Sequence, residues 1–204
     1  FDAKATPPDD LPAIAERVRG FRTVIVENHP RLCSEACVRF RDQIGTTLEV
    51  ALGLETIHPV VLPALNKQMT LKDFERATHF LIENAIQVRT FVLLRPPFLD
   101  EAEGLDWAVR SVEYAFSLGV GCCSVIPTRA GNGMMERLQE QGFFTPPQFR
   151  SLERALEAGI GMGQGRVFVD LWDVERQVPC PTCGPARIER LRRMNLTQTI
   201  LPTI

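Results

Sequence analysis

The 204-residue chain has no apolar run that approaches the roughly 20 residues needed to span a bilayer, and no signal peptide precedes its first expected helix. It has no strong excess of charge: the formal net charge is -2, so no overall basic field argues for a nucleic-acid partner. Internal repeats and low-complexity tracts are also absent from the sequence. Its 45% hydrophobic and 24% charged residues are ordinary for a globular protein. We therefore expect a cytoplasmic protein without a membrane partner, made of one substantial domain or a large fragment of one.

Six cysteines fall into three close pairs along the chain: Cys33 and Cys37, Cys122 and Cys123, and Cys180 and Cys183. Because no secretory signal precedes them, reduced thiols or metal ligands are a better interpretation than a disulfide framework. The first pair falls inside an expected helix, where two thiolates are too few for an iron–sulfur cluster, so we interpret it as buried packing. The second pair falls in a strand whose neighbouring side chains face opposite ways, and we interpret it as structural.

The third pair has a different setting. Residues 180–183 (Cys-Pro-Thr-Cys) fall in an expected loop, and their spacing suits one half of a zinc site, which makes Cys180 and Cys183 the candidate metal ligands. A second pair of ligands is not visible downstream. A basic helix over residues 186–194 follows. Its arginines could touch RNA, although a solvated helix face is the commoner explanation: Arg187, Arg190, Arg192 and Arg193.

Short apolar strands alternate with amphipathic helices along the first part of the chain. The expected strands cover residues 23–26, 48–54, 88–94 and 119–126, and the helices between them cover residues 30–43, 70–85 and 100–117. This alternation predicts an α/β fold with parallel strands joined by right-handed crossovers. Four such units cannot close an eight-stranded barrel, so both an open sheet and a partial barrel stay open. Two short helices, a glycine-rich link (159–165) and a strand (166–171) follow.

Polar residues end the expected strands. Glu27, Glu55 and Arg95 each follow a strand, and Pro127 closes the fourth. The carboxyl ends of parallel strands lie at one edge of a β/α array, so these residues could converge on one ligand. Two carboxylates with nearby basic groups suit a ligand rich in hydroxyl and amino donors. The alternative is that each glutamate caps the next helix. The occurrence of two acids on adjacent strands favours a site.

The order of these elements resembles the later part of the radical S-adenosylmethionine (radical SAM) barrel, in the branch that includes the Elongator catalytic subunit and archaeosine-synthase-like proteins. Residues 27–30 (Glu-Asn-His-Pro) resemble the family's Glu-x-Arg-Pro after a strand, and Glu55 lies in Gly-Leu-Glu-Thr. Residues 66–70 (Asn-Lys-Gln-Met-Thr) are similar to Asn-Arg-Gly-His-Thr, and residues 126–133 (Ile-Pro-Thr-Arg-Ala-Gly-Asn-Gly) complete the series. The resemblance covers residues 1–147, which we expect to form the partial barrel, with residues 148–204 as a C-terminal extension.

The resemblance implies a partial (β/α)6 barrel whose family binds SAM on a [4Fe-4S] cluster and generates a 5'-deoxyadenosyl radical. Glu27 and Glu55 would then contact the ribose or methionine part of SAM, and Lys67 would lie near the SAM carboxylate. Pro127 would lie beside the adenine. The implied substrate is tRNA or another nucleobase-containing molecule.

The chain departs from the family pattern in three places. His29 and Lys67 stand where the family has arginines, and the cluster motif CxxxCxxC is absent. The chain also begins at Phe1 rather than methionine, so we expect a processed, trimmed or incomplete product that has lost the first barrel strands. Cluster ligands would then lie outside the chain, which by itself would be inactive. The missing strands, or another protein, would pair with the exposed sheet edge.

Two other functions remain open at this stage. One is a non-catalytic β/α binding module with a metal-linked tail through Cys180 and Cys183. The other is a hydrolase or lyase that uses Glu27 and Glu55 as acid and base, although no nucleophile motif accompanies them. A gene that encodes CxxxCxxC shortly before Phe1 would favour the radical SAM enzyme.

Overall fold

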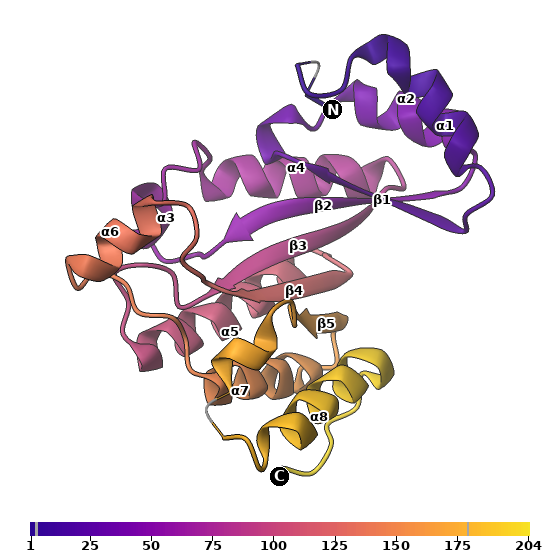
Figure 1. Cartoon of the computed structure of the whole chain (residues 1–204). Coiled ribbons are helices and arrows are strands. Elements are labelled where there is room, and N and C mark those ends of the chain that lie inside the picture. The colour runs from indigo at the N-terminus through magenta and orange to yellow at the C-terminus, as the bar shows by residue number, and fades with distance from the viewer. Residues whose placement is uncertain (3, 179) are drawn as a thin grey trace.

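The computed structural model describes residues 1–2, 4–178 and 180–204. Its sheet has five strands in the order β1-β2-β3-β4-β5, and every neighbouring pair is parallel (Figure 1). The strands are β1 (Thr23–Asn28), β2 (Thr47–Glu55), β3 (Gln87–Leu94), β4 (Cys122–Pro127) and β5 (Arg166–Val169). Sequence order equals spatial order, as in a barrel that is wound in one direction. The fold is therefore α/β, a partial (β/α) barrel, as the sequence predicted.

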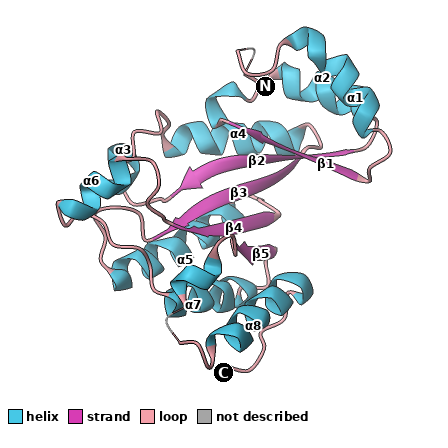
Figure 2. Cartoon of the chain, viewed as in Figure 1, coloured by secondary structure: helices cyan, strands magenta, loops and turns pink. Residues whose placement is uncertain are grey.

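Helices connect and cover the strands, and Figure 2 shows the helices that pack on the sheet gathered on one of its faces. The α-helices are α1 (Leu11–Val18), α2 (Glu35–Ile44), α3 (Val61–Ala64), α4 (Leu71–Glu83), α5 (Glu101–Ser117), α6 (Met134–Glu140), α7 (Phe149–Gly161) and α8 (Gly184–Thr197). Short 3-10 helices are η1 (Pro8–Asp10), η2 (Pro30–Leu32) and η3 (Val174–Gln177). The opposite face of the sheet lines a cavity, which is described below.

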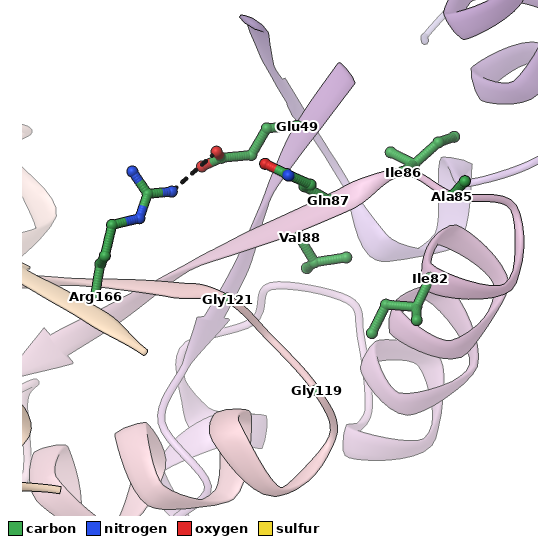
Figure 3. A pocket seen from close by; sticks show the side chains of 9 residues that line it. All are labelled: Glu49, Ile82, Ala85, Ile86, Gln87, Val88, Gly119, Gly121 and Arg166. Atoms are coloured by element: carbon green, nitrogen blue, oxygen red, sulfur yellow. Dashed lines mark hydrogen bonds and ion pairs between the residues drawn. The ribbon is translucent and has the colours of Figure 1, made fainter. Parts of the chain in front are cut away.

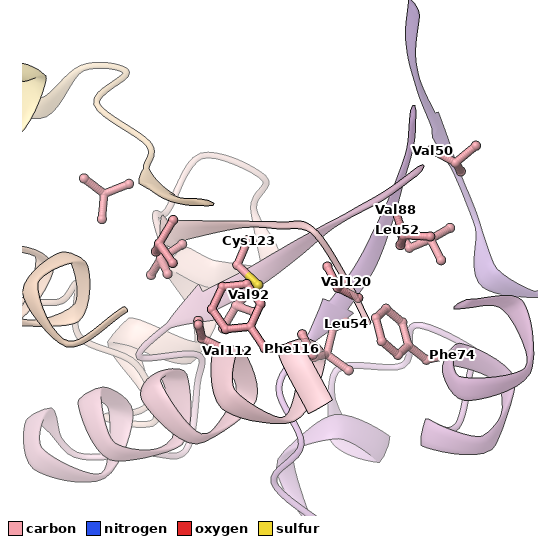
Figure 4. Close-up of a cluster of buried hydrophobic side chains, with 14 of the residues drawn as sticks. Val50, Leu52, Leu54, Phe74, Val88, Val92, Val112, Phe116, Val120 and Cys123 are labelled. Carbon is pink, nitrogen blue, oxygen red and sulfur yellow. The ribbon is translucent and has the colours of Figure 1, made fainter. Parts of the chain in front are cut away.

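The core lies between the sheet and this helical layer. Val50, Leu52 and Leu54 alternate along β2 and are completely buried, and Figure 4 shows Leu54 on the same side of the sheet as Phe74 of α4. The intervening residues of β2 face the other side of the sheet, because successive side chains of a strand point to opposite faces. β2 is buried on both faces along most of its length, which explains its nearly continuous apolar sequence.

The start of α4 agrees with the prediction. Thr70 Oγ1 accepts a hydrogen bond from the backbone N–H of Asp73 at 3.2 Å, and Asp73 Oδ2 accepts one from the N–H of Thr70 at 2.9 Å. This reciprocal capping box satisfies donors that the first helical turn cannot pair internally. It fixes the end of the loop that carries Lys67.

Two expected elements differ from the structure. Pro30 begins a 3-10 turn instead of the long helix, because Ser34 is extended (φ -158°, ψ -177°) and α2 starts only at Glu35. Cys33 therefore lies before the helix and not inside it. The expected glycine-rich link is also partly wrong, since α7 continues to Gly161. Gly159 faces β5, where a side-chain Cβ would come within 2.7 Å of Val167 Cγ1.

β5 comes from the part of the chain that we expected to be an extension, yet it pairs with β4 in the same sheet. The sheet thus includes residues from both sides of the boundary expected at residue 147, and the division into two domains stays a prediction. None of the helices in the described part of the chain has the length and apolar character required to cross a membrane.

Candidate functional site

A cavity of about 700 Å3 lies over the open face of the sheet at the carboxyl ends of β1 and β2, and we call it the rim pocket. Glu27 and Glu55 both line it, together with Lys67 from the loop that precedes α4. Its apolar part includes Phe91 and Leu93, which project from β3 on the face opposite the helices. The carboxyl edge of a parallel β/α array is where ligands ordinarily bind.

Glu55 is held in an uncommon backbone conformation. Its φ is 66°, in the left-handed region that costs most residues other than glycine roughly 1–2 kcal/mol, and the pairing of β2 with β3 shifts register between Gly53 and Glu55. This irregularity ends the strand and places the carboxylate over Gly53, on the pocket side. Glu55 Oε1 pairs with Lys67 Nζ at 3.1 Å, and the glutamate side chain is only 11% exposed.

The backbone around Lys67 is positioned by the loop that follows β1. Asn66 and Gln68 both have positive φ, 51° and 53°, so Lys67 lies between two left-handed residues. His29 Nε2 lies 3.0 Å from the Lys67 carbonyl oxygen, and Arg31 Nη1 donates to the Gln68 carbonyl at 3.1 Å. His29 Nδ1 accepts the Arg31 N–H, which leaves Nε2 as the protonated nitrogen that donates to Lys67.

Arg95 and Pro127, which follow or close two other strands, do not line the rim pocket as the sequence had suggested. Arg95 turns away from the rim pocket and pairs with Glu101 Oε2 at 2.7 Å and with the Pro146 carbonyl at 3.1 Å. Pro127 is buried at the end of β4, and its neighbour Ile126 lines the pocket in its place. The structure therefore brings together Glu27, Glu55 and Lys67, while the assignment of Pro127 to a bound adenine stays a prediction.

Cys180 and Cys183 lie at the start of α8. The backbone N–H of Cys183 donates to Cys180 Sγ at 3.4 Å, and this bond lowers the pKa of the Cys180 thiol to about 7. The described residues contain no group of three or more Cys, His, Asp or Glu side chains arranged to hold a metal ion. The zinc assignment to these two cysteines stays a prediction, because a structural zinc ion takes four ligands.

The basic helix that follows is largely occupied by contacts within the protein. Arg187 pairs with Glu153 at 2.5 Å, and Arg190, which is 3% exposed, pairs with Glu157 at 2.7 Å. Both arginines thus face α7. This geometry argues against the suggestion that Arg187 and Arg190 contact RNA.

A second cavity of about 470 Å3 lies at the opposite, amino end of the strands (Figure 3). Its acid, Glu49, is 3% exposed and pairs with Arg89 Nε at 2.5 Å and Arg166 Nη2 at 3.3 Å. The two arginines compensate the buried carboxylate. Ion pairs at the amino end of the strands of a β/α barrel contribute to the stability of the fold, whereas catalytic residues lie at the carboxyl end. We therefore assign no ligand to this cavity.

Comparisons with known proteins agree with the α/β fold described above. No protein-family model matches the chain. It is 29% identical over 186 residues to archaeosine synthase subunit beta of Methanosarcina acetivorans, covering 86% of this chain and 53% of the relative. It is 30% identical over 134 residues to archaeosine synthase subunit beta of Thermococcus kodakarensis, covering 61% of this chain and 39% of the relative. Among solved structures, Elp3 of Methanocaldococcus infernus superposes with a TM-score of 0.64 at 15% identity, over 85% of this chain and 42% of that chain.

The chain is thus similar in sequence to archaeosine synthase subunit beta and in fold to Elp3. The likeness to Elp3 supports the α/β fold of parallel strands with covering helices. D-psicose 3-epimerase shares the fold more distantly, with a TM-score of 0.51 and 14% identity over 90% of this chain and 64% of that chain. The chain spans about half the length of the curated relatives it matches over most of its residues.

Proposed function

We propose that this chain binds S-adenosylmethionine in the rim pocket and forms part of a radical SAM enzyme that modifies tRNA. The observation that carries the proposal is the convergence of Glu27, Glu55 and Lys67 in one pocket. They come from two adjacent strand ends and one loop, on a partial barrel shared with radical SAM relatives. Each is a residue for which the sequence resemblance implies a contact with SAM.

The charges of the rim pocket suit SAM. A carboxylate accepts hydrogen bonds only, so Glu27 and Glu55 would accept from ribose hydroxyls or from the ammonium group of the methionine part. Lys67 would pair with the methionine carboxylate, and its existing ion pair with Glu55 keeps its ammonium group at the pocket. Phe91 and Leu93 supply the apolar surface that adenine and methylene groups need.

A [4Fe-4S] cluster does not fit the residues of this chain. Such clusters are held by several cysteine thiolates, and the CxxxCxxC motif is absent from the sequence. No group of three or more potential ligands occurs among the described residues. Generation of the 5'-deoxyadenosyl radical is therefore not assigned to any residue here, and the contribution proposed for this chain is to bind and orient SAM.

The proposed substrate and partner follow from the relatives. Two of them are named as the beta subunit of archaeosine synthase, and on that basis we propose tRNA as the substrate class and a second protein as a partner. The edge of β1, which lies at one end of the sheet order, offers backbone groups with which further strands or another protein could pair.

Titration with SAM and with decarboxylated SAM tests the assignment of Lys67. We expect Lys67→Ala to weaken SAM binding about tenfold or more, since a hydrogen bond to a charged group contributes roughly 1.5–3 kcal/mol. The affinity for decarboxylated SAM should change little, because it lacks the group that Lys67 contacts. Lys72→Ala, an exposed lysine on α4, is the matched control. Equal losses for both ligands would refute the assignment.

A further inference from the structure

Two cysteines meet behind the strand end that carries Glu27. Asn28 Nδ2 donates to Cys33 Sγ at 3.5 Å and to Cys37 Sγ at 3.8 Å, so one amide group serves both sulfur atoms. The S–H of Cys33 lies 3.8 Å from the His29 carbonyl oxygen. The sequence pattern suggested two buried packing residues within one helix. The late start of α2 instead places Cys33 in an extended segment, where its thiol faces that of Cys37.

The side chains of Cys33 and Cys37, which share the Asn28 amide, also interact with each other. This contact raises the pKa of Cys33 far above its ordinary value, and the same contact lowers the pKa of Cys37 to about 7. The backbone N–H of Ser34 and the Asn28 amide favour the Cys37 thiolate as well. The pair thus holds a proton on one sulfur while the other becomes a thiolate near neutral pH. A thiolate is the reactive form of cysteine.

Access to the pair is one-sided. Cys37 is completely buried, whereas Cys33 keeps partial exposure and follows Leu32, which lines the rim pocket. Cys33 is therefore the more accessible of the two cysteines. Cys122 and Cys123 have no such arrangement, because both are buried in β4 and burial raises the pKa of both.

We propose that Cys33 and Cys37 form a redox-active dithiol that low-molecular-weight disulfides oxidise to an intramolecular disulfide. In the first step the Cys37 thiolate takes the proton of Cys33, and the resulting Cys33 thiolate attacks one sulfur of the small disulfide. The other half of the small disulfide leaves as a thiolate and takes that proton from Cys37. In the second step the Cys37 thiolate, formed again, attacks Cys33 Sγ, and the second half leaves as a thiolate that takes a proton from water. Two protein thiols lose two electrons, and the small disulfide becomes two small thiols. This site is independent of the ligand of the rim pocket.

Peptide mapping after oxidation tests the proposal on the full chain. The reduced protein is incubated with oxidised glutathione and then denatured, so that every free thiol can be alkylated. Trypsin cleavage after Arg31 and Arg39 releases residues 32–39, which contain both cysteines. The expected product is this peptide with no alkyl group and a mass lower by two hydrogens. The change should be reversed by dithiothreitol before alkylation. The peptide that contains Cys122 and Cys123 should be alkylated twice under the same conditions.

The variant Cys37→Ser removes the resolving thiol, and we expect a glutathione mixed disulfide to accumulate on Cys33. Circular dichroism checks that this variant keeps the fold. A peptide of residues 32–39 from the unmodified protein that carried two alkyl groups after treatment with oxidised glutathione would overturn the proposal. So would a stable mixed disulfide on Cys33 in the unmodified protein, because it would mean that Cys37 does not resolve it.

Discussion

Gly53 lies under the carboxylate of Glu55, and this contact makes Gly53→Ala a selective perturbation of the rim pocket. A Cβ at position 53 would lie 2.5 Å from Glu55 Oε1, the same atom that pairs with Lys67. Ordinary contact begins at about 3.4 Å, so the carboxylate has to move by nearly 1 Å. The displaced atom is the end of a flexible side chain, and the backbone can stay in place.

We expect Gly53→Ala to change the free energy of unfolding less than the free energy of SAM binding. The Glu55–Lys67 pair involves a half-exposed lysine, and such pairs contribute about 0–1 kcal/mol to folding. Alanine also lowers the entropy of the unfolded chain, which offsets part of that loss. The displaced carboxylate would lose a charged hydrogen bond to SAM, worth roughly 1.5–3 kcal/mol, or about a 10- to 150-fold increase in Kd.

Isothermal titration with SAM and urea unfolding measure the two effects on the same preparations. We expect Gly53→Ala to raise the Kd while the free energy of unfolding changes by less than about 1 kcal/mol. Gly20→Ala is the matched control, because nothing lies within 4 Å of a Cβ at that position. A folded Gly53→Ala protein that binds SAM as tightly as the unmodified chain would refute the role of Glu55.

Three further changes test the fold. Arg190→Met removes a buried guanidinium that binds Glu157 and the carbonyl oxygens of Leu201 and Pro202, and we expect urea unfolding to show a loss of about 3 kcal/mol. A loss below about 1 kcal/mol would contradict the buried pairing. Gly159→Ala overpacks the contact with Val167 and should cost about 1–3 kcal/mol, and the second change Val167→Ala should restore part of it. The hydrogen bond from Thr70 lowers the pKa of Asp73, so the contribution of this cap is present at neutral pH and is lost as pH falls through the lowered pKa. Asp73→Asn removes the titrating carboxylate and should therefore flatten the acid side of the stability profile, measured by urea unfolding, and an unchanged profile would count against the cap.

Much of the fold could be predicted because its strands and helices carry clear apolar periodicities. Thr70 and Asp73 indicated the start of α4, and the structure shows the capping box there. The start of α2 was missed because Pro30 opens a 3-10 turn and Ser34 is extended, and neither conformation follows from the apolar pattern. That shift matters, since it moves Cys33 out of the helix and beside Cys37.

Part of the candidate site could also be predicted from the sequence. The positions of Glu27 and Glu55 at the ends of adjacent expected strands indicated a shared rim, and the family resemblance added Lys67. The structure places all three in the rim pocket. The support from His29 and Arg31 could not be predicted, because both bind backbone carbonyl groups of a loop more than 35 residues away in the sequence. Every residue has a backbone carbonyl group, so the amino-acid sequence does not indicate which carbonyl group a side chain will bind. Only the folded structure shows these hydrogen bonds.

Titration of the full chain with SAM tests the central claim most directly. The account predicts saturable one-to-one binding that weakens about tenfold or more in both Glu27→Gln and Glu55→Gln, and that is unchanged in Glu16→Gln, an exposed glutamate of α1. Absence of saturable binding to the folded chain, or equal affinities for all four proteins, would contradict it.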